Sequence, residues 1–427
     1  MPLIIIVLTI ILIICSILYF PTITIKNFKF SSYWPIALIG ALLLLITNSV
    51  SVETVINTFT SNDSMNPIKI LILFISMTIL SIFLDEVGFF KYVANKATEL
   101  LNGSQTKLFF GFYILISLLT MFTSNDIIIL TFTPFICYYC KNSKINPIPY
   151  LVSEFVAANT WSMALIIGNP TNIYLASAFN IDFIDYLSVM ILPTIIASVV
   201  SLLILYLLFR NQLKNTIQKS EVSDIEKPNK TLLIIGLFHL ITTTILIAIS
   251  SYINLEMWKI TLCFVISLIL TSSIYFIIKK EKATILINTI KRAPYSLIPF
   301  VLSMFIIVLS LNNEGITKII SDFLNKITPV FSFGIGGAIA ANFINNIPMS
   351  VLFANMSLTS NASIYASIIA SNIAAYITPV GALAGIMWMG LLKTYNIDFT
   401  FKKFMGYGLL IGIPTLIMAL LTLSFII

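Results

Sequence analysis

Charged residues are scarce in this sequence of 427 residues. Asp, Glu, Lys and Arg make up 10% of it, and 58% of its residues are apolar. A soluble domain carries roughly a quarter charged residues, so a chain with this composition cannot cover a water-facing surface. A soluble globular domain is therefore excluded, and we expect lipid to surround most of the chain.

Histidine and cysteine are also rare, with one and four copies. The sequence has no cluster of metal-ligating residues, no nucleophile–base pair within its apolar runs, and no Gly-x-x-x-x-Gly-Lys-[Ser/Thr] phosphate loop. These absences argue against an enzyme, a metal centre, a resident cofactor and a pump that uses nucleotide by itself. His239 lies in an apolar run, which favours a structural role. Cys137 and Cys140 suit small apolar filler or a soft metalloid pair.

Long apolar runs recur along the whole chain, for example at 2–20, 68–84 and 186–209. A membrane-crossing helix needs about 20 such residues, because hydrocarbon leaves every backbone N–H and C=O to be satisfied within the helix. Strand alternation is absent. The sequence therefore predicts an all-α polytopic membrane protein with about 10 crossing helices. The first run has no basic flank or small-residue cleavage site, so we interpret it as a retained span.

Basic residues concentrate in a few loops. Twenty of the 24 Lys and Arg residues fall in the segments 21–33, 86–107, 141–149, 210–230, 279–293 and 393–403. The other loops carry Glu53, Asp63, Asp182 and Asp185. This is the positive-inside bias, which orients membrane proteins, so the net charge of +7 does not indicate a nucleic-acid partner. Both termini are predicted to lie outside the cytoplasm of a multi-pass protein in the cell membrane.

The same order of parts occurs twice along the chain. An apolar span ends in an acidic residue beside a glycine at 85–88 and again at 312–315, and an amphipathic stretch follows each. In both halves there then follows an apolar run with a polar break. A second interrupted span comes next, and an uninterrupted span ends the half. The basic loops give the halves opposite orientations. We therefore predict inverted repeats at 2–209 and 231–427, joined by a cytoplasmic linker at 210–230.

Two of the interrupted runs in these repeats are too short to cross the membrane twice. The arms on either side of 124–126 have roughly 14 to 16 residues, below the length of a normal span. We predict re-entrant hairpins at 108–140 and 330–358, entering from opposite faces, with an exposed external turn as the alternative for the first. The two further interrupted spans are predicted as broken helices at 150–179 and 362–393.

The polar breaks are the candidate solute site. Irregular backbone at membrane depth is tolerated only where it lines a cavity or is buried in protein. Free N–H groups at the start of a half-helix attract anions or polar oxygens, and free carbonyls at its end coordinate Na⁺. The candidate binding residues are Ser124, Asn125, Asp126, Asn159, Gly168, Asn169, Pro170, Thr171, Asn172, Asn345, Asn346, Pro348, Asn372, Thr378, Pro379 and Gly381.

Asp126 is the one carboxylate predicted at a break. An ionised Asp near the midplane costs about 3 kcal/mol on insertion scales, so it is a candidate for binding a coupling ion, either H⁺ or Na⁺. Its alternative role is to cap the helical arm that starts at Ile127. Glu154 lies early in its span, so a place at the membrane interface and a functional place are both open for it. Asp85 and Glu86 are predicted at a cytoplasmic helix end. Lys and Arg are absent from the breaks, which slightly favours a neutral hydroxylated solute over a multiply charged anion.

Motifs along nearly the whole chain resemble the arsenite efflux permeases. That family belongs to a superfamily of ion transporters that includes Na⁺/H⁺ antiporters and divalent-anion:sodium symporters. The resemblance is carried by the segments 84–90, 124–126 with Thr133-Pro134, 292–294, 345–348 and 377–384, and by Trp388. It implies a mobile transport domain made of both hairpins and both broken helices, which moves like an elevator, often in dimers. It also implies export of neutral As(III) trihydroxide and antimonite in exchange for protons.

Two positions depart from that resemblance. The arsenite pattern has acidic residues where this chain has Asn159 and Asn372, and their loss removes titratable groups. The segment 168–172 is more similar to other branches of the superfamily. The sequence thus predicts a secondary transporter of a small inorganic ion or oxo-solute, with proton-coupled arsenite or antimonite efflux ahead of Na⁺-coupled transport of an anion such as a dicarboxylate. A passive channel is a remote alternative. A homodimer and a cytoplasmic ATPase partner stay open.

Overall fold

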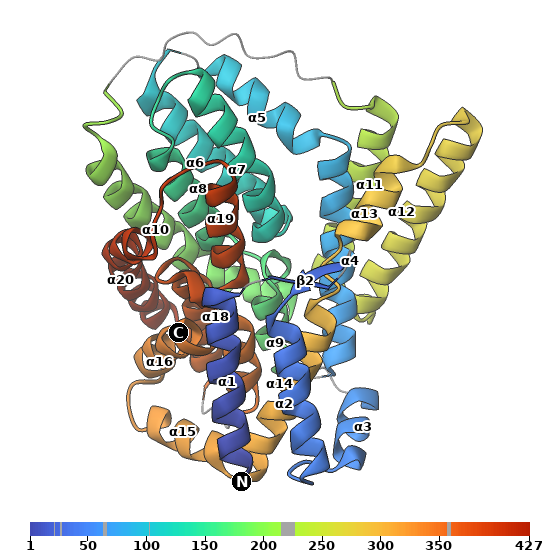
Figure 1. Cartoon of the computed structure of the whole chain (residues 1–427), viewed down its shortest axis with the longest axis vertical. Coiled ribbons are helices and arrows are strands. Elements are labelled where there is room, and N and C mark those ends of the chain that lie inside the picture. The colour runs from blue at the N-terminus through green and yellow to red at the C-terminus, as the bar shows by residue number, and fades with distance from the viewer. Residues whose placement is uncertain (21, 26–27, 63–65, 102, 215–226, 357–359) are drawn as a thin grey trace.

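The computed structural model of the chain describes residues 1–20, 22–25, 28–62, 66–101, 103–214, 227–356 and 360–427. Helices dominate it (Figure 1), which confirms the predicted all-α membrane class. Among the described residues, seven helices are long and apolar enough to cross a membrane, and four shorter apolar helices accompany them. The number of crossings stays a prediction.

The first half of the chain ends with a long helix that follows a broken one. Its elements are α1 (Pro2–Tyr19), β1 (Thr22–Ile25), β2 (Phe28–Ser31), α2 (Tyr33–Ile46), α3 (Val52–Thr60), α4 (Pro67–Glu86), α5 (Phe89–Leu100), α6 (Gln105–Phe122), α7 (Asn125–Asn142), α8 (Ile148–Trp161), η1 (Ile166–Gly168), α9 (Pro170–Ala178) and α10 (Phe183–Phe209).

The second half repeats this order without the strands. Its elements are α11 (Lys230–Ala248), α12 (Met257–Lys279), α13 (Thr284–Arg292), α14 (Leu297–Asn313), α15 (Ile316–Asn325), α16 (Pro329–Ile344), α17 (Asn346–Ala354), α18 (Asn361–Ile373), η2 (Ala374–Tyr376), η3 (Pro379–Gly381), α19 (Leu383–Thr394) and α20 (Phe401–Ile426). Residues 215–226 of the predicted linker and 357–358 of the second hairpin lie outside the described residues. The division into domains stays a prediction.

A glycine turn ends the same helix in each half. Gly88 follows α4 with φ +89°, and Gly315 follows α14 with φ +73°. This left-handed conformation strains any residue with a Cβ, so glycine is the residue that turns the chain into the next amphipathic helix, α5 or α15. The repeated acidic–glycine signal of the sequence thus corresponds to a repeated structural element.

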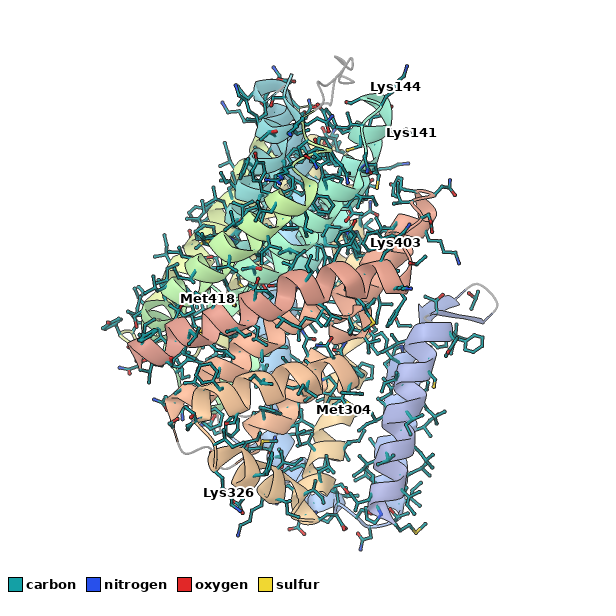
Figure 2. The ribbon with its side chains drawn as sticks, turned by 90° about the vertical axis from the view of Figure 1, so that its left-hand side faces the viewer. Lys141, Lys144, Met304, Lys326, Lys403 and Met418 are labelled. Carbon is teal, nitrogen blue, oxygen red and sulfur yellow. The ribbon has the colours of Figure 1, made fainter. Side chains whose placement is uncertain are left out.

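The two hairpins enter from opposite ends of the molecule. Figure 2 shows Lys141 and Lys144, at the open end of the α6–α7 hairpin, at the top, whereas Lys326, just before α16, lies at the bottom. Each broken helix packs its second half on the hairpin of the other repeat: α9 packs on α17, and α19 packs on α7. The halves therefore interlock, and the breaks of both meet inside the protein.

A second group of helices stands beside the hairpins and broken helices. In Figure 1, α11, α12 and α13 lie with α4 on one side of the molecule, and α10 lies with α20 on the other. His239 is buried in α11, with its ring nitrogens 2.8 Å from the Ile235 carbonyl oxygen and 3.1 Å from Ser267 Oγ on α12. These bonds fit the structural role predicted for it.

One small element was not expected from the sequence. β1 and β2 form an antiparallel hairpin between α1 and α2, with Thr22 opposite Ser31 and Ile23 opposite Phe30. The β-branched run Thr-Ile-Thr-Ile favours extended backbone. Each strand has four residues, which is too short for the alternation by which strands are recognised in a sequence.

Candidate functional site

A small cavity lies where the four breaks meet. Asn125 and Asp126 from the first hairpin and Asn346 from the second line it. Asn169 and Pro170 from the first broken helix complete its polar side. Its remaining lining residues are apolar: Ile347, Ala382, Leu383, Ala384 and Leu297 of α14. No Lys, Arg or His is among these lining residues.

The tip of the first hairpin is buried in protein. Asn125 is 2% exposed and donates from Nδ2 to Asn159 Oδ1 on α8 at 3.0 Å. The alternative of an exposed external turn is therefore wrong. Ser124 Oγ and Asn125 Oδ1 are buried, and neither has a hydrogen-bond partner in the described part of the chain. A buried polar atom without a partner costs about 1–3 kcal/mol, so these two atoms favour a solute or ion that supplies the missing bonds.

Asp126 lies two residues further into α7 than the capping residue does. Ser124 holds the N-cap position, in extended conformation, and α7 begins at Asn125. The predicted capping role of Asp126 is therefore wrong. Its half-buried side chain reaches the cavity from the first turn of the helix, where free N–H groups favour a negative charge. No ion pair to Asp126 is present among the described residues.

The second hairpin turns at Asn345, which has φ +74°. Its side chain accepts from the Ile347 N–H at 3.3 Å and donates to the Val380 carbonyl at 3.0 Å. Asn346 donates from Nδ2 to the Ser371 carbonyl at 3.3 Å. Hydrogen bonds from the Asn345 and Asn346 side chains thus hold the second tip against the second broken helix. The Asn125 side chain holds the first tip against the first broken helix in the same way.

A buried amide network joins the two broken helices behind the cavity. Asn372 Oδ1 accepts from Asn169 Nδ2 at 3.0 Å and from Ser162 Oγ at 2.7 Å. Asn372 Nδ2 donates to Asn172 Oδ1 at 2.7 Å. Thr171 Oγ1 lies 2.9 Å from Ser371 Oγ. Every one of these bonds crosses from one repeat to the other, so the network fixes the two breaks relative to each other.

The predicted residues therefore separate into two groups. Asn125, Asp126, Asn169, Pro170 and Asn346 line the cavity. The other predicted residues lie at or beside the breaks but do not line the cavity: Ser124, Asn159, Gly168, Thr171, Asn172, Asn345, Pro348, Asn372, Thr378, Pro379 and Gly381.

Two glycines allow the breaks to pack this tightly. A Cβ on Gly168 would lie 2.2 Å from the Ser162 carbonyl oxygen, and one on Gly381 would lie 2.4 Å from that of Ala374. Both neighbours are backbone atoms that cannot turn aside. These two positions require glycine because of close approach, since neither has a positive φ.

Several polar residues of the site were not predicted. Asn342, one turn before the second tip, donates to the Ala338 carbonyl, but its Oδ1 is buried without a partner in the described chain. Ser162 and Ser371 bridge the repeats. Asn342 could have been predicted from the sequence, since it is a polar residue in the last turn before a break. Ser162 and Ser371 could not, because serine is common in membrane helices at positions without a functional role.

A family model described as "Citrate transporter" matches residues 10–367. The chain belongs to this family of membrane transporters. The resemblance to arsenite permeases is confirmed too. An arsenical pump membrane protein of Escherichia coli is 26% identical over 368 residues, covering 82% of this chain and 85% of that protein. One from Yersinia enterocolitica is 27% identical with the same coverage. The predicted transport function of this membrane protein is thereby confirmed.

A solved structure supports the fold. The Alcanivorax borkumensis YdaH transporter, whose crystal structure is described as having an unusual topology, matches with a TM-score of 0.58. The match covers 100% of this chain and 97% of that one, at 14% sequence identity. At this identity the similarity concerns the fold alone, and it extends over both halves of the chain.

Proposed function

We propose that this transporter exports As(III), as the neutral trihydroxide, and antimonite across the cell membrane in exchange for protons. The observation that carries the proposal is the cavity at the breaks, which is lined by amides and one carboxylate and has no cationic side chain among its lining residues. The E. coli and Yersinia relatives named as arsenical pump membrane proteins support the substrate.

The cavity offers what a small trihydroxide needs. Its O–H groups can donate to Asn125 Oδ1 and to the Asp126 carboxylate, and its oxygens can accept from the amide of Asn169 or Asn346 or from free backbone N–H groups. The first turns of α7, α9, α17 and α19 all reach the cavity. Each helix N-terminus carries roughly half a positive charge, so four of them with one ionised Asp126 give a net charge of about +1. That balance suits a neutral or singly charged solute better than a trianion.

The direct experiment is growth of an arsenite-sensitive host that expresses the chain. We expect the parent protein to restore growth in arsenite and Asp126→Asn to lose this protection. Asp398→Asn makes the same chemical change on an exposed loop, where the carboxylate pairs with Lys403, and should protect as well as the parent. If the parent gives no protection while it is present in the membrane, arsenite is not the substrate.

Na⁺-coupled transport of an anion is the second candidate. The four helix N-termini at the cavity favour it, as does the description of the family as citrate transporters. Ser124 Oγ and Asn125 Oδ1, which lack partners, could then help to coordinate Na⁺ at the first hairpin tip. Vesicles containing the chain would accumulate labelled citrate or a dicarboxylate only under an inward Na⁺ gradient. Accumulation that does not depend on Na⁺ would rule this candidate out.

We also propose a cellular location for the chain and its orientation across the membrane. The chain would lie in the cell membrane, with the basic loops in the cytoplasm and both termini outside. Transport would proceed by an elevator movement of the hairpins and broken helices. A homodimer and a cytoplasmic ATPase partner remain predictions.

A further inference from the structure

Glu154 is a buried carboxyl that the solute site does not use. It lies in the middle of α8 with 0% of its surface exposed. Because α8 begins at Ile148, Glu154 is nearly two turns inside the helix. Thr133 Oγ1 on α7 lies 2.9 Å and 3.1 Å from its two carboxyl oxygens.

The surroundings of Glu154 are neutral. The titratable group that faces it from α7 is the Cys137 thiol, and α19 contributes the indole of Trp388. No Lys, Arg or His forms an ion pair with Glu154 within the described ranges. Burying an ionised carboxylate without a cationic partner is costly, which favours the neutral form of this side chain.

Two donors are nevertheless available for the ionised form. The Thr133 hydroxyl already donates a hydrogen bond to the carboxyl group. Trp388 is 1% exposed, and its Nε1–H has no hydrogen-bond acceptor in the described chain. A buried donor without an acceptor, beside a carboxyl that can gain negative charge, has a natural partner in the carboxylate. The pocket around Glu154 can therefore hold both protonation states, and its hydrogen bonds differ between them.

The same two helices connect Glu154 to the solute cavity. Thr133 lies two turns after Asp126 on α7, and Trp388 lies one turn after Ala384 on α19. Asp126 and Ala384 both line the cavity. Helices α7 and α19 pack against each other, although they belong to different repeats. Through Thr133 and Trp388, Glu154 therefore contacts the two helices whose first turns line the cavity.

We propose that Glu154 is the proton-carrying group of the transport cycle. Its carboxyl binds one proton from water on one side of the membrane and releases it on the other, and the solute crosses in the opposite direction. The step forms and breaks only the carboxyl O–H bond. This inference rests on the proposed proton-coupled export. In this proposal Asp126 binds the solute and Glu154 carries the proton.

The test uses the full chain in everted membrane vesicles with an acidic interior. The parent protein should accumulate As(III) against its gradient and release protons as it does so. Glu154→Gln keeps the acceptor for Thr133 but cannot ionise, so accumulation should fall by about tenfold or more, whereas As(III) exchange at equal pH persists. Glu99→Gln, on an exposed face of α5, should behave like the parent. Undiminished accumulation by Glu154→Gln overturns the proposal and leaves the proposed function standing.

A second measurement does not depend on arsenite. Infrared difference spectra between acid and alkaline pH report the C=O stretch of each buried carboxyl that titrates. We expect one band that is lost in Glu154→Gln, shifted in Thr133→Val and Trp388→Phe, and retained in Asp126→Asn. If the parent does not move arsenite but the band behaves in this way, the substrate is wrong and the proton site stands. The absence of any band that depends on Glu154 contradicts the proton site.

Discussion

Asn372 shows why the centre of this protein uses amides. Its carbonyl oxygen accepts two hydrogen bonds, and its NH₂ group donates to Asn172 Oδ1 and to the Ile368 carbonyl. A carboxylate in its place would accept the first pair but could not donate the second. Asn159 repeats the same local bond, since its Nδ2 donates to the Phe155 carbonyl four residues earlier. At Asn372 an amide, which donates and accepts at once, also satisfies Asn172 Oδ1, which an ionised carboxylate would leave without a donor.

We therefore expect Asn372→Asp to destabilise the protein. Asn172 Oδ1 would lose its donor, at a cost of about 1–3 kcal/mol for a buried polar atom. Thermal unfolding in detergent measures the change. Asn396→Asp, at an exposed position, is the matched control and should leave the transition temperature unaltered. Equal stability of the two variants would mean that the network does not hold the breaks together.

A second prediction concerns Gly168, the glycine in the break of the first broken helix. Gly168→Ala places a methyl group against the Ser162 carbonyl, so the break must open, at a cost of about 1–3 kcal/mol. Gly390→Ala, inside α19, meets nothing within 4 Å and should be neutral or slightly stabilising, because alanine favours a helix. Thermal unfolding in detergent measures both variants, and we expect a lower unfolding temperature for Gly168→Ala than for Gly390→Ala. A stable Gly168→Ala protein would show that the break is loosely packed.

At the scale of elements, α4 is fastened at both ends. Near its start, Lys69 pairs with Glu256 at 2.9 Å, where α11 and α12 connect. At its end, Arg292 of α13 pairs with Asp85 at 2.7 Å, and Thr131 of α7 donates to the same carboxylate at 2.7 Å. Asp85 lies at the end of α4, as the sequence suggested, and its carboxylate also links α4 to α13 and to the first hairpin.

The pair at the start of α4 gives a pH dependence. The hydrogen bond from Lys69 is the main cause that lowers the pKa of Glu256 from its ordinary 4.5 to about 2. A lowered pKa stabilises the folded state above pH 4.5, and this contribution disappears as the pH falls toward 2. Glu256→Gln should therefore lower stability near neutral pH by no more than about 1 kcal/mol, because the pair is partly exposed. The difference from the parent should shrink in acid. A difference that persists at low pH would contradict this assignment.

Spans and breaks could be predicted because each has a strong local cause. Long apolar runs have one stable form in hydrocarbon, so α4, α10 and α20 follow from the sequence. The tips at Asn125 and Asn345 follow from clusters of polar residues that interrupt short apolar runs. Long-range partners could not be predicted. Nothing near Asn372 indicates that it bonds Asn172, 200 residues away. The burial of Glu154 was missed for the same reason, since α7 and α19 cover it.

At the scale of the whole molecule, the inverted order of parts is what produces one cavity from two halves. Each hairpin reaches the centre from its own end, and each broken helix packs on the opposite hairpin. The solute site therefore exists only when both repeats are folded together. The elevator movement proposed for this fold would carry the tips, the breaks and Glu154 as one unit.

Cysteine labelling tests the inverted arrangement. In a chain whose four native cysteines are replaced by alanine, Lys326→Cys should react with a membrane-impermeant maleimide on intact cells. Lys141→Cys, at the opposite end of the molecule (Figure 2), should react only after the membrane is permeabilised. Labelling of both positions from the same side would contradict the inversion.

The most direct test of the central claim is As(III) flux into everted membrane vesicles from cells that express the chain. With an acidic interior, the account predicts accumulation of As(III) above its outside concentration, loss of this accumulation in Asp126→Asn, and retention in Asp398→Asn. A parent protein that accumulates no more As(III) than vesicles without it would contradict the account.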